Sequence, residues 1–120
     1  MKRGDVFSAR LNPVEGSEQA GTRPVVVVSR DAINAASPVV IIVPCTSYRT
    51  GKRIYPSQVI LGAPEGGLKA DSIVLCEQVR AISKSRLVSQ WGSLPASSMQ
   101  RIDQALLIVL DLEATGLGPW

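Results

Sequence analysis

Arg23 is the residue of this chain best suited to hold an anion. It follows a polar, glycine-rich stretch at 12–22 and directly precedes Pro24 and the apolar run Val25–Val28. A guanidinium fixed at the start of a buried strand can hold a phosphate through two hydrogen bonds, and it keeps its charge at any physiological pH. The same side chain could instead pair with Asp or Glu to fix the strand end, and the residues alone leave both interpretations open.

Thr46 is the second candidate for chemistry. It ends the apolar run Val39–Thr46, next to a basic loop. Its hydroxyl can donate a hydrogen bond to a phosphoryl oxygen, but it is too weakly acidic or basic to transfer protons alone, so its role would be positioning and charge stabilisation. The alternative is an ordinary β-branched residue that favours the strand.

Proton transfer must use side chains other than histidine, because the chain has none. Histidine-dependent triads and histidine-pair ribonuclease mechanisms are therefore excluded. Glu18 lies in the polar loop beside Gln19, and burial would make its carboxylate basic enough to accept a proton from a ribose hydroxyl. Glu18 could equally be an exposed loop carboxylate or a partner of Arg23. Asn12, at the start of the loop, is either a turn residue or a ligand.

The segment 48–56 is a basic loop with aromatic residues at intervals. Cations that alternate with rings suit single-stranded RNA, because the charges follow the backbone and the rings stack on bases. The alternative is a solvated hairpin tip. The residues concerned are Tyr48, Arg49, Lys52, Arg53 and Tyr55.

Composition limits the possible classes of protein. The 120 residues suffice for one domain, residues 1–120, and the net charge of +3 permits an anionic partner without demanding one. Cys45 and Cys76 lie in apolar runs and are expected to be reduced, buried thiols, with no metal-ligand spacing and no cofactor. No apolar stretch follows Met1, and the longest apolar run, Pro38–Cys45, is too short for a membrane span. We therefore expect a cytoplasmic protein.

The pattern of apolar residues predicts a mostly β fold of about seven short strands. Turn residues separate the strands, and Pro44 is expected at an edge or bulge near a strand end. Residues 31–36 should form a short helical turn at most. The expected strands are 5–11, 25–29, 39–46, 57–61, 71–78, 79–83 and 85–89. The segments 71–78 and 79–83 are either two adjacent strands or one bent strand.

The C-terminal part has helical periodicity. It predicts a helix over roughly 95–113, with Pro95 in its first turn and Gly116 as its C-terminal cap. Trp91 should cover a core edge, and Trp120 is either frayed or docked on a partner. The apolar stripe that should pack on the sheet is formed by Met99, Ile102, Leu106, Val109 and Leu110.

Five features together resemble the MazF/PemK family of toxin endoribonucleases, over almost the whole chain. Four are sequence strings, and the fifth is the helical C-terminal part. The most specific string is G-S-E-Q-A-G-T-R-P at 16–24. The other strings are K-R-G-D-V at 2–6, L-N-P at 11–13 and P-C-T-S at 44–47.

The resemblance implies a small SH3-like barrel of antiparallel strands with a C-terminal helix, in a homodimer. It implies a sequence-specific, metal-independent endoribonuclease that cleaves single-stranded messenger RNA to 2′,3′-cyclic phosphate and 5′-hydroxyl ends. The family's catalytic arginine and threonine match Arg23 and Thr46, and Glu18 is the candidate base. The candidate RNA contacts are Asn12, Ser17, Gln19, Ser47, Arg49, Lys52, Arg53 and Gln78, the last from a strand E-Q-V-R.

The resemblance also implies a partner, an antitoxin with an acidic disordered tail that covers the RNA groove. Two other functions remain open at this point. One is a gyrase-poisoning toxin of the same fold that cleaves nothing, and the other is a catalytically silent RNA-binding module.

Overall fold

The valine run forms the centre of an antiparallel sheet in the computed structural model, which describes residues 1–13 and 15–112. β2 (Thr22–Val27) pairs with β1 (Asp5–Arg10) on one side and with β3 (Val39–Ser47) on the other. Val25 and Val27 join one hydrophobic cluster and Val26 joins the other, so β2 is buried on both faces. The strand begins at Thr22 rather than at Val25, which brings Arg23 into the sheet.

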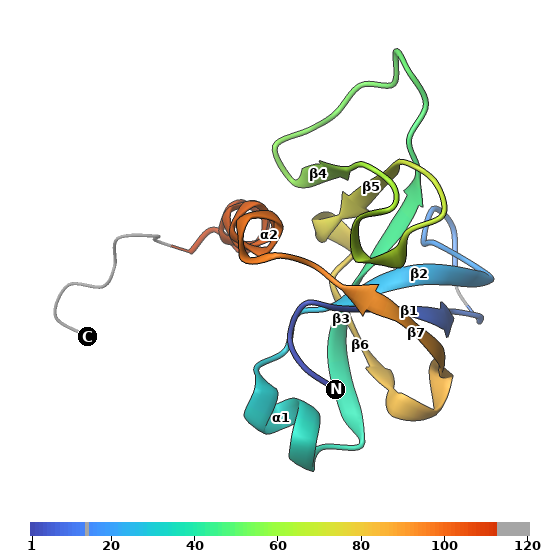
Figure 1. The fold of residues 1–120 in the computed structure, drawn as a ribbon, viewed down its shortest axis with the longest axis vertical. Coiled ribbons are helices and arrows are strands. Elements are labelled where there is room, and N and C mark those ends of the chain that lie inside the picture. The colour runs from blue at the N-terminus through green and yellow to red at the C-terminus, as the bar shows by residue number, and fades with distance from the viewer. Residues whose placement is uncertain (14, 113–120) are drawn as a thin grey trace, which may run out of the picture.

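The strand order is β4-β5-β3-β2-β1-β7, and all pairings are antiparallel (Figure 1). On one edge β3 has two partners, β6 along its first half and β5 along its last residues. Pro44 lies in the gap between them, inside a central strand rather than at an edge, where a residue without an N–H interrupts neither pairing. The other strands are β4 (Gln58–Leu61), β5 (Ser72–Leu75), β6 (Arg80–Ser83) and β7 (Leu87–Ser93).

Three short 3₁₀ helices interrupt the segments expected to be continuous strands or turns. They are η1 (Glu65–Gly67), η2 (Cys76–Gln78) and η3 (Lys84–Arg86). The prediction of a strand over 71–78 was therefore too long, because β5 ends at Leu75 and η2 turns the chain toward β6. Gln78 lies in η2 and not in a strand.

η1 lies directly against the backbone of β7. A Cβ added to Gly67 would lie 2.2 Å from the carbonyl oxygen of Trp91, and one added to Gly92 would lie 2.8 Å from the backbone of Gly66. Gly67 also has a φ of +80°, which side chains disfavour. The 3₁₀ helix η1 therefore covers β7, the last strand at one end of the sheet. The seven strands of this sheet confirm the predicted mostly β architecture.

The C-terminal helix α2 (Ala96–Leu110) packs on the sheet beside β4 (Figure 1). Met99 and Ile102 are buried as predicted, and Ala105 is buried with them. Leu110, which the periodicity placed on the same stripe, is 51% exposed. The helix ends before residue 113, because Asp111 adopts a left-handed φ of 55° and ends it.

Residues 31–36 form a helix, α1 (Asp31–Ala36), rather than a single turn at most. Its buried Asn34 donates to the carbonyl oxygen of Ser29 at 2.8 Å, which fixes the helix on the chain that leaves β2. α1 lies at the end of β3 opposite to the β3–β4 loop (Figure 1). Gly116 and Trp120, for which a cap and a docked or frayed end were expected, lie outside the described residues.

Candidate active site

Arg23 and Thr46 lie on neighbouring strands, facing the same pockets. Val25 pairs with Pro44 in the β2–β3 ladder, and continuing this antiparallel register by two residues brings Arg23 opposite Thr46. Both residues, together with Ser47, line two adjoining pockets. The fold therefore brings together the two side chains predicted to be catalytic, although they are far apart in the chain.

The guanidinium of Arg23 has no carboxylate partner among the described residues. Its Nε donates to the carbonyl oxygen of Ala20 at 3.0 Å, and its side chain is half-buried. This bond orients the group without neutralising it, because a carbonyl carries no net charge. The structure therefore does not support the alternative interpretation in which Arg23 only pairs with an acid to fix the strand end.

The two pockets beside Arg23 differ in chemistry. The smaller pocket, of about 170 Å³, has apolar walls that include Cys45, Leu68 and Trp91. The larger pocket, of about 530 Å³, is lined by Arg49 and Lys52 from the β3–β4 loop. Arg23 and Thr46 therefore lie between a small apolar recess and a cationic channel, an arrangement that suits a nucleotide with its base on one side and its backbone on the other.

Sequence reasoning missed Lys69 as part of this site and gave Trp91 only a structural role. The ammonium of Lys69 lies 4.7 Å from the centre of a Trp91 ring, a cation–π distance, and both residues line the apolar pocket. Trp91 also packs against the main hydrophobic cluster, as expected of a residue that covers a core edge. No local motif marks either residue, because η1 and β7 meet only in the folded chain.

Neither thiol is suited to act as a nucleophile or a base at neutral pH. Burial raises the pKa of the Cys45 thiol to about 12, with a smaller contribution from Cys76. Burial, followed by the charges of Glu77 and Asp103, raises the pKa of Cys76 to about 12. Both groups are free and buried as predicted, and both are protonated at neutral pH.

Glu18 lies in a separate pocket of about 220 Å³, beside Gln19, Glu77 and Gln78. Its carboxylate is exposed and accepts a hydrogen bond from the backbone N–H of Glu15 at 2.6 Å, so it is not the partner of Arg23. Pro44 also lines this pocket. Because alternate residues of a strand share a face, Pro44 and Thr46 point the same way and the two sites are neighbours.

Gln78 binds the polar loop rather than presenting a free amide. Its Oε1 accepts from the N–H of Gln19 at 2.8 Å, and its Nε2 donates to the carbonyl oxygen of Ser17 at 3.4 Å. The Oε1 of Gln19 is buried and has no hydrogen-bond partner among the described residues. Ser17, Gln19 and Gln78 thus form one connected unit that shapes the loop beside Glu18.

Asn12 closes the same loop at its other end. Its Oδ1 accepts from the N–H of Gly21 at 3.1 Å, which supports the interpretation of Asn12 as a turn residue. Asn12 lines a different pocket, away from Thr46. If Asn12 contacts RNA, it does so at a different pocket from the one that Arg23 and Thr46 line.

The cations of the basic β3–β4 loop lie in two different surroundings. Arg49 and Lys52 line the pocket of Arg23, whereas the guanidinium of Arg53 lies 5.1 Å from the ring centre of Tyr55. All three cations are exposed. The loop is not the tip of a hairpin, because β4 pairs with β5 and not with β3.

Metal clusters and membrane-spanning helices have no candidates among the described residues. No group of three or more His, Cys, Asp or Glu side chains in residues 1–13 and 15–112 could hold a metal ion. Over the same residues, no helix is long and apolar enough to cross a membrane.

Known proteins show which family this site belongs to. Residues 2–110 match the family described as "PemK-like, MazF-like toxin of type II toxin-antitoxin system", and the chain belongs to this family. The chain is 42% identical over 112 residues to "Endoribonuclease EndoA" of Bacillus subtilis (strain 168), which covers 93% of this chain and 96% of that protein.

Solved structures give the same result for the fold. MazF (Form-I) from Deinococcus radiodurans matches with a TM-score of 0.79 and 28% identity, over 93% of this chain and 97% of that one. An endoribonuclease in complex with its cognate antitoxin, from a mycobacterial species, matches with a TM-score of 0.76 and 25% identity, over 100% and 98%. The resemblance noted from the sequence motifs is therefore confirmed.

Proposed function

We propose that this chain is a sequence-specific, metal-independent endoribonuclease toxin of a toxin–antitoxin module, acting on single-stranded messenger RNA in the cytoplasm. The observation that carries the proposal is that Arg23 and Thr46 line the same two pockets, with no carboxylate among the described residues paired with the guanidinium. An arginine fork and a hydroxyl at the edge of a cationic channel suit a phosphodiester. Its similarity to EndoA, which is named an endoribonuclease, supports the same reaction.

The reaction is attack by a ribose 2′-hydroxyl on the adjacent phosphorus. A P–O2′ bond forms and the P–O5′ bond breaks, which leaves a 2′,3′-cyclic phosphate and a 5′-hydroxyl. Arg23 stabilises the charge that develops on the non-bridging oxygens, and Thr46 donates a further hydrogen bond. A metal is not required, because the nucleophile is already on the substrate and the enzyme supplies position and charge.

Glu18 is the proposed general base. It takes the proton of the 2′-hydroxyl, and the departing 5′-oxygen takes a proton from water. The position of its pocket beside Pro44, on the same face of β3 as Thr46, supports this assignment. The bond from the N–H of Glu15 holds the carboxylate in the loop, so RNA binding must bring the ribose to it.

The RNA follows the cationic side of the site. Ser47, Arg49 and Lys52 contact the phosphates next to the scissile one, because they line the pocket of Arg23. The unit of Ser17, Gln19 and Gln78 borders the next nucleotide on the side of Glu18. Arg53 and Asn12 lie farther out and contribute to the shape and charge of the groove.

The protein partner is an antitoxin with an acidic disordered tail, and the chain acts as a homodimer. The mycobacterial endoribonuclease was solved with its cognate antitoxin, and MazF of Deinococcus radiodurans was solved with MazE. An acidic tail would compete with RNA for the same cations, Arg23 included.

The test is incubation of the purified protein with a long single-stranded RNA in EDTA, beside the variant Arg23→Ala. We expect discrete fragments with cyclic phosphate ends, and a loss of about 2–4 kcal/mol of barrier stabilisation in the variant, as for removal of one oxyanion donor. Near-normal cleavage by a folded Arg23→Ala protein would refute the mechanism. Intact RNA that still binds the wild-type protein would identify a silent binding module, and RNA neither bound nor cut would favour a gyrase poison.

A further inference from the structure

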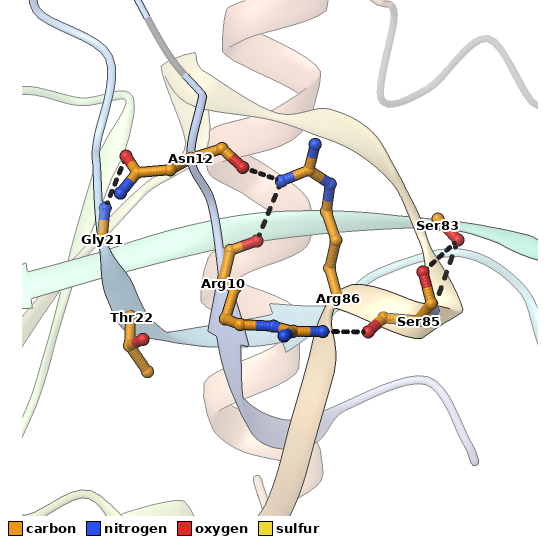
Figure 2. A pocket seen from close by; sticks show the side chains of 7 residues that line it. All are labelled: Arg10, Asn12, Gly21, Thr22, Ser83, Ser85 and Arg86. Carbon is orange, nitrogen blue, oxygen red and sulfur yellow. Dashed lines mark hydrogen bonds between the residues drawn. The ribbon is translucent and has the colours of Figure 1, made fainter.

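The pocket that Asn12 lines faces away from the cleavage site and is not used by the proposed reaction. It measures about 600 Å³, and its walls come from β1, the polar loop, β2, the end of β6 and η3. Figure 2 shows the residues that line it, which are Arg10, Asn12, Gly21, Thr22, Ser83, Ser85 and Arg86. Every one of these residues is charged, polar or glycine.

The pocket lies on the opposite face of the β1–β2 ribbon from Arg23. Thr22 and Arg23 are consecutive in β2, so their side chains point to opposite faces. Arg10 pairs directly with Thr22 in the ladder, which places both residues on the face away from Arg23. The ribbon therefore carries one arginine site on each side.

Each arginine of the pocket donates hydrogen bonds to backbone carbonyl oxygens of the segment that carries the other arginine. Arg10 donates from Nη2 to the carbonyl oxygen of Ser85 at 2.8 Å. Arg86 donates from Nη1 to the carbonyl oxygens of Arg10, at 3.2 Å, and Asn12 (Figure 2). Neither guanidinium pairs with a carboxylate among the described residues, and no carboxylate lines the pocket. Both side chains are thus oriented and both keep their full positive charge.

Hydroxyl groups complete an anion-binding surface. The Oγ atoms of Ser83 and Ser85 lie 2.9 Å apart, and Thr22 adds a third hydroxyl to the wall. Oriented guanidinium N–H groups together with hydroxyls are the groups that proteins place around phosphate. The pocket contains no aromatic side chain on which a base could stack, so it suits the sugar–phosphate backbone and not a base.

The polarity of the walls argues against a peptide. A disordered acidic tail that orders on binding must bury apolar side chains to offset the lost conformational entropy. None of the residues that line the pocket has a wholly apolar side chain against which such groups could pack. An RNA strand needs only charge and hydroxyls at such a point, since phosphate contacts position the strand without reading its sequence.

We propose that the pocket of Arg10 and Arg86 binds a backbone phosphate of the RNA substrate, outside the segment that is cleaved. The inference rests on the proposed ribonuclease function. A single strand held at Arg23 passes around the end of the β1–β2 ribbon and places a distant phosphate in the pocket. This contact adds sequence-independent affinity for long strands and leaves the rate of the chemical step unchanged.

The test compares Arg10→Gln with Arg30→Gln, which removes the same charge from an exposed site in none of the pockets described. Binding is measured by fluorescence anisotropy over a series of salt concentrations. The probes are single-stranded RNAs of about 20 and about 5 nucleotides, chosen because small β-barrels cover roughly 4–16 nucleotides. A 2′-deoxy nucleotide at the mapped cleavage site blocks cutting, and the melting temperature of each variant checks its fold.

We expect Arg10→Gln to weaken binding of the long strand by about threefold to tenfold and to reduce the slope of log K against log salt by about 0.7. The short strand should bind both variants equally. Equal binding of the long strand by the two variants would overturn the proposal. So would a loss confined to an acidic antitoxin peptide. The all-ribose form of the long RNA, bound but left intact by the wild-type protein, would refute only the proposed function, whereas no binding of either form would refute both.

Discussion

The β1–β2 ribbon carries arginines on both faces, and their surroundings differ. Arg23 lines a recess of about 170 Å³ together with Thr46 and the apolar side chains of Cys45 and Leu68. On the other face Arg10 and Arg86 line an open polar pocket of about 600 Å³. All three guanidiniums are oriented by backbone carbonyl groups rather than by carboxylates.

The difference shows how one type of side chain can serve catalysis or binding. Apolar walls lower the local dielectric constant, so a fixed charge acts more strongly on the charge that develops in a transition state. An open polar pocket leaves its charges well solvated, where they contribute affinity but little selectivity for a transition state over a ground state. Arg23 is therefore expected to control the rate, and Arg10 the affinity for RNA.

The largest expected difference comes from replacing arginine by lysine at each site. Arg23→Lys should lower kcat by about tenfold to a hundredfold, because an ammonium cannot reproduce the bidentate fork on a phosphoryl group. Arg10→Lys should change kcat/KM on a long RNA by less than about twofold, because a point charge is enough to hold a distant phosphate. Steady-state kinetics on one long substrate measures both.

The double variant is the control for this comparison, since independent sites should give additive effects on free energy. Equal losses at the two positions would mean that the two faces do not divide catalysis from binding in the way described.

Thr46→Val should have the next largest effect. The change keeps the β-branched shape and removes one hydroxyl donor, so kcat should fall about tenfold, as for the loss of a hydrogen bond of about 1.4 kcal/mol. Thr22→Val, in the pocket of Arg10 and Arg86, is the matched control and should leave kcat on a short RNA unchanged. A rise in KM at constant kcat for Thr46→Val would show that the hydroxyl binds the ground state only.

Gln78→Leu should have the smallest effect on activity, about threefold. The change removes both side-chain hydrogen bonds to the polar loop and leaves the Arg23–Thr46 pair in place. The loop should then open more often near Glu15 and Glu18, and a glutamate-specific protease should cut it faster. Asn12→Ala loosens the opposite end of the loop and serves as the comparison. An unchanged rate of proteolysis in Gln78→Leu would contradict the conclusion that the Gln78 hydrogen bonds stabilise the polar loop.

Local patterns were enough to predict much of the fold and the two central site residues. The valine run predicts a buried strand, and the helical spacing of apolar residues around Ile102 predicts an amphipathic helix. Both patterns therefore predicted β2 and α2 close to where they occur. Arg23 and Thr46 could be paired in advance only through the family motifs. Their positions on adjacent strands follow from a register that depends on the whole sheet.

Contacts across long stretches of chain could not be predicted in this way. Gln78 meets Gln19 across 59 residues, and Arg86 meets Arg10 across 76. No periodicity encodes such a contact, because it depends on how η2 and η3 turn the chain between strands. The expected strand over 71–78 hid the first of these turns, and with it the role of Gln78.

The contact between η1 and β7 has a consequence for how the sequence can vary. Gly67 and Gly92 lie where an added methyl group would overlap the backbone of the facing segment. No rotamer change can relieve such an overlap, so in a library randomised over this region only glycine should survive at both positions. Lys69, close by along the chain, is exposed and meets no such restriction. The two glycines thus flank residues of the apolar recess, whereas Lys69 lines the recess itself and can be replaced without a backbone overlap. Position 69 is therefore the place to alter substrate preference without loss of the fold.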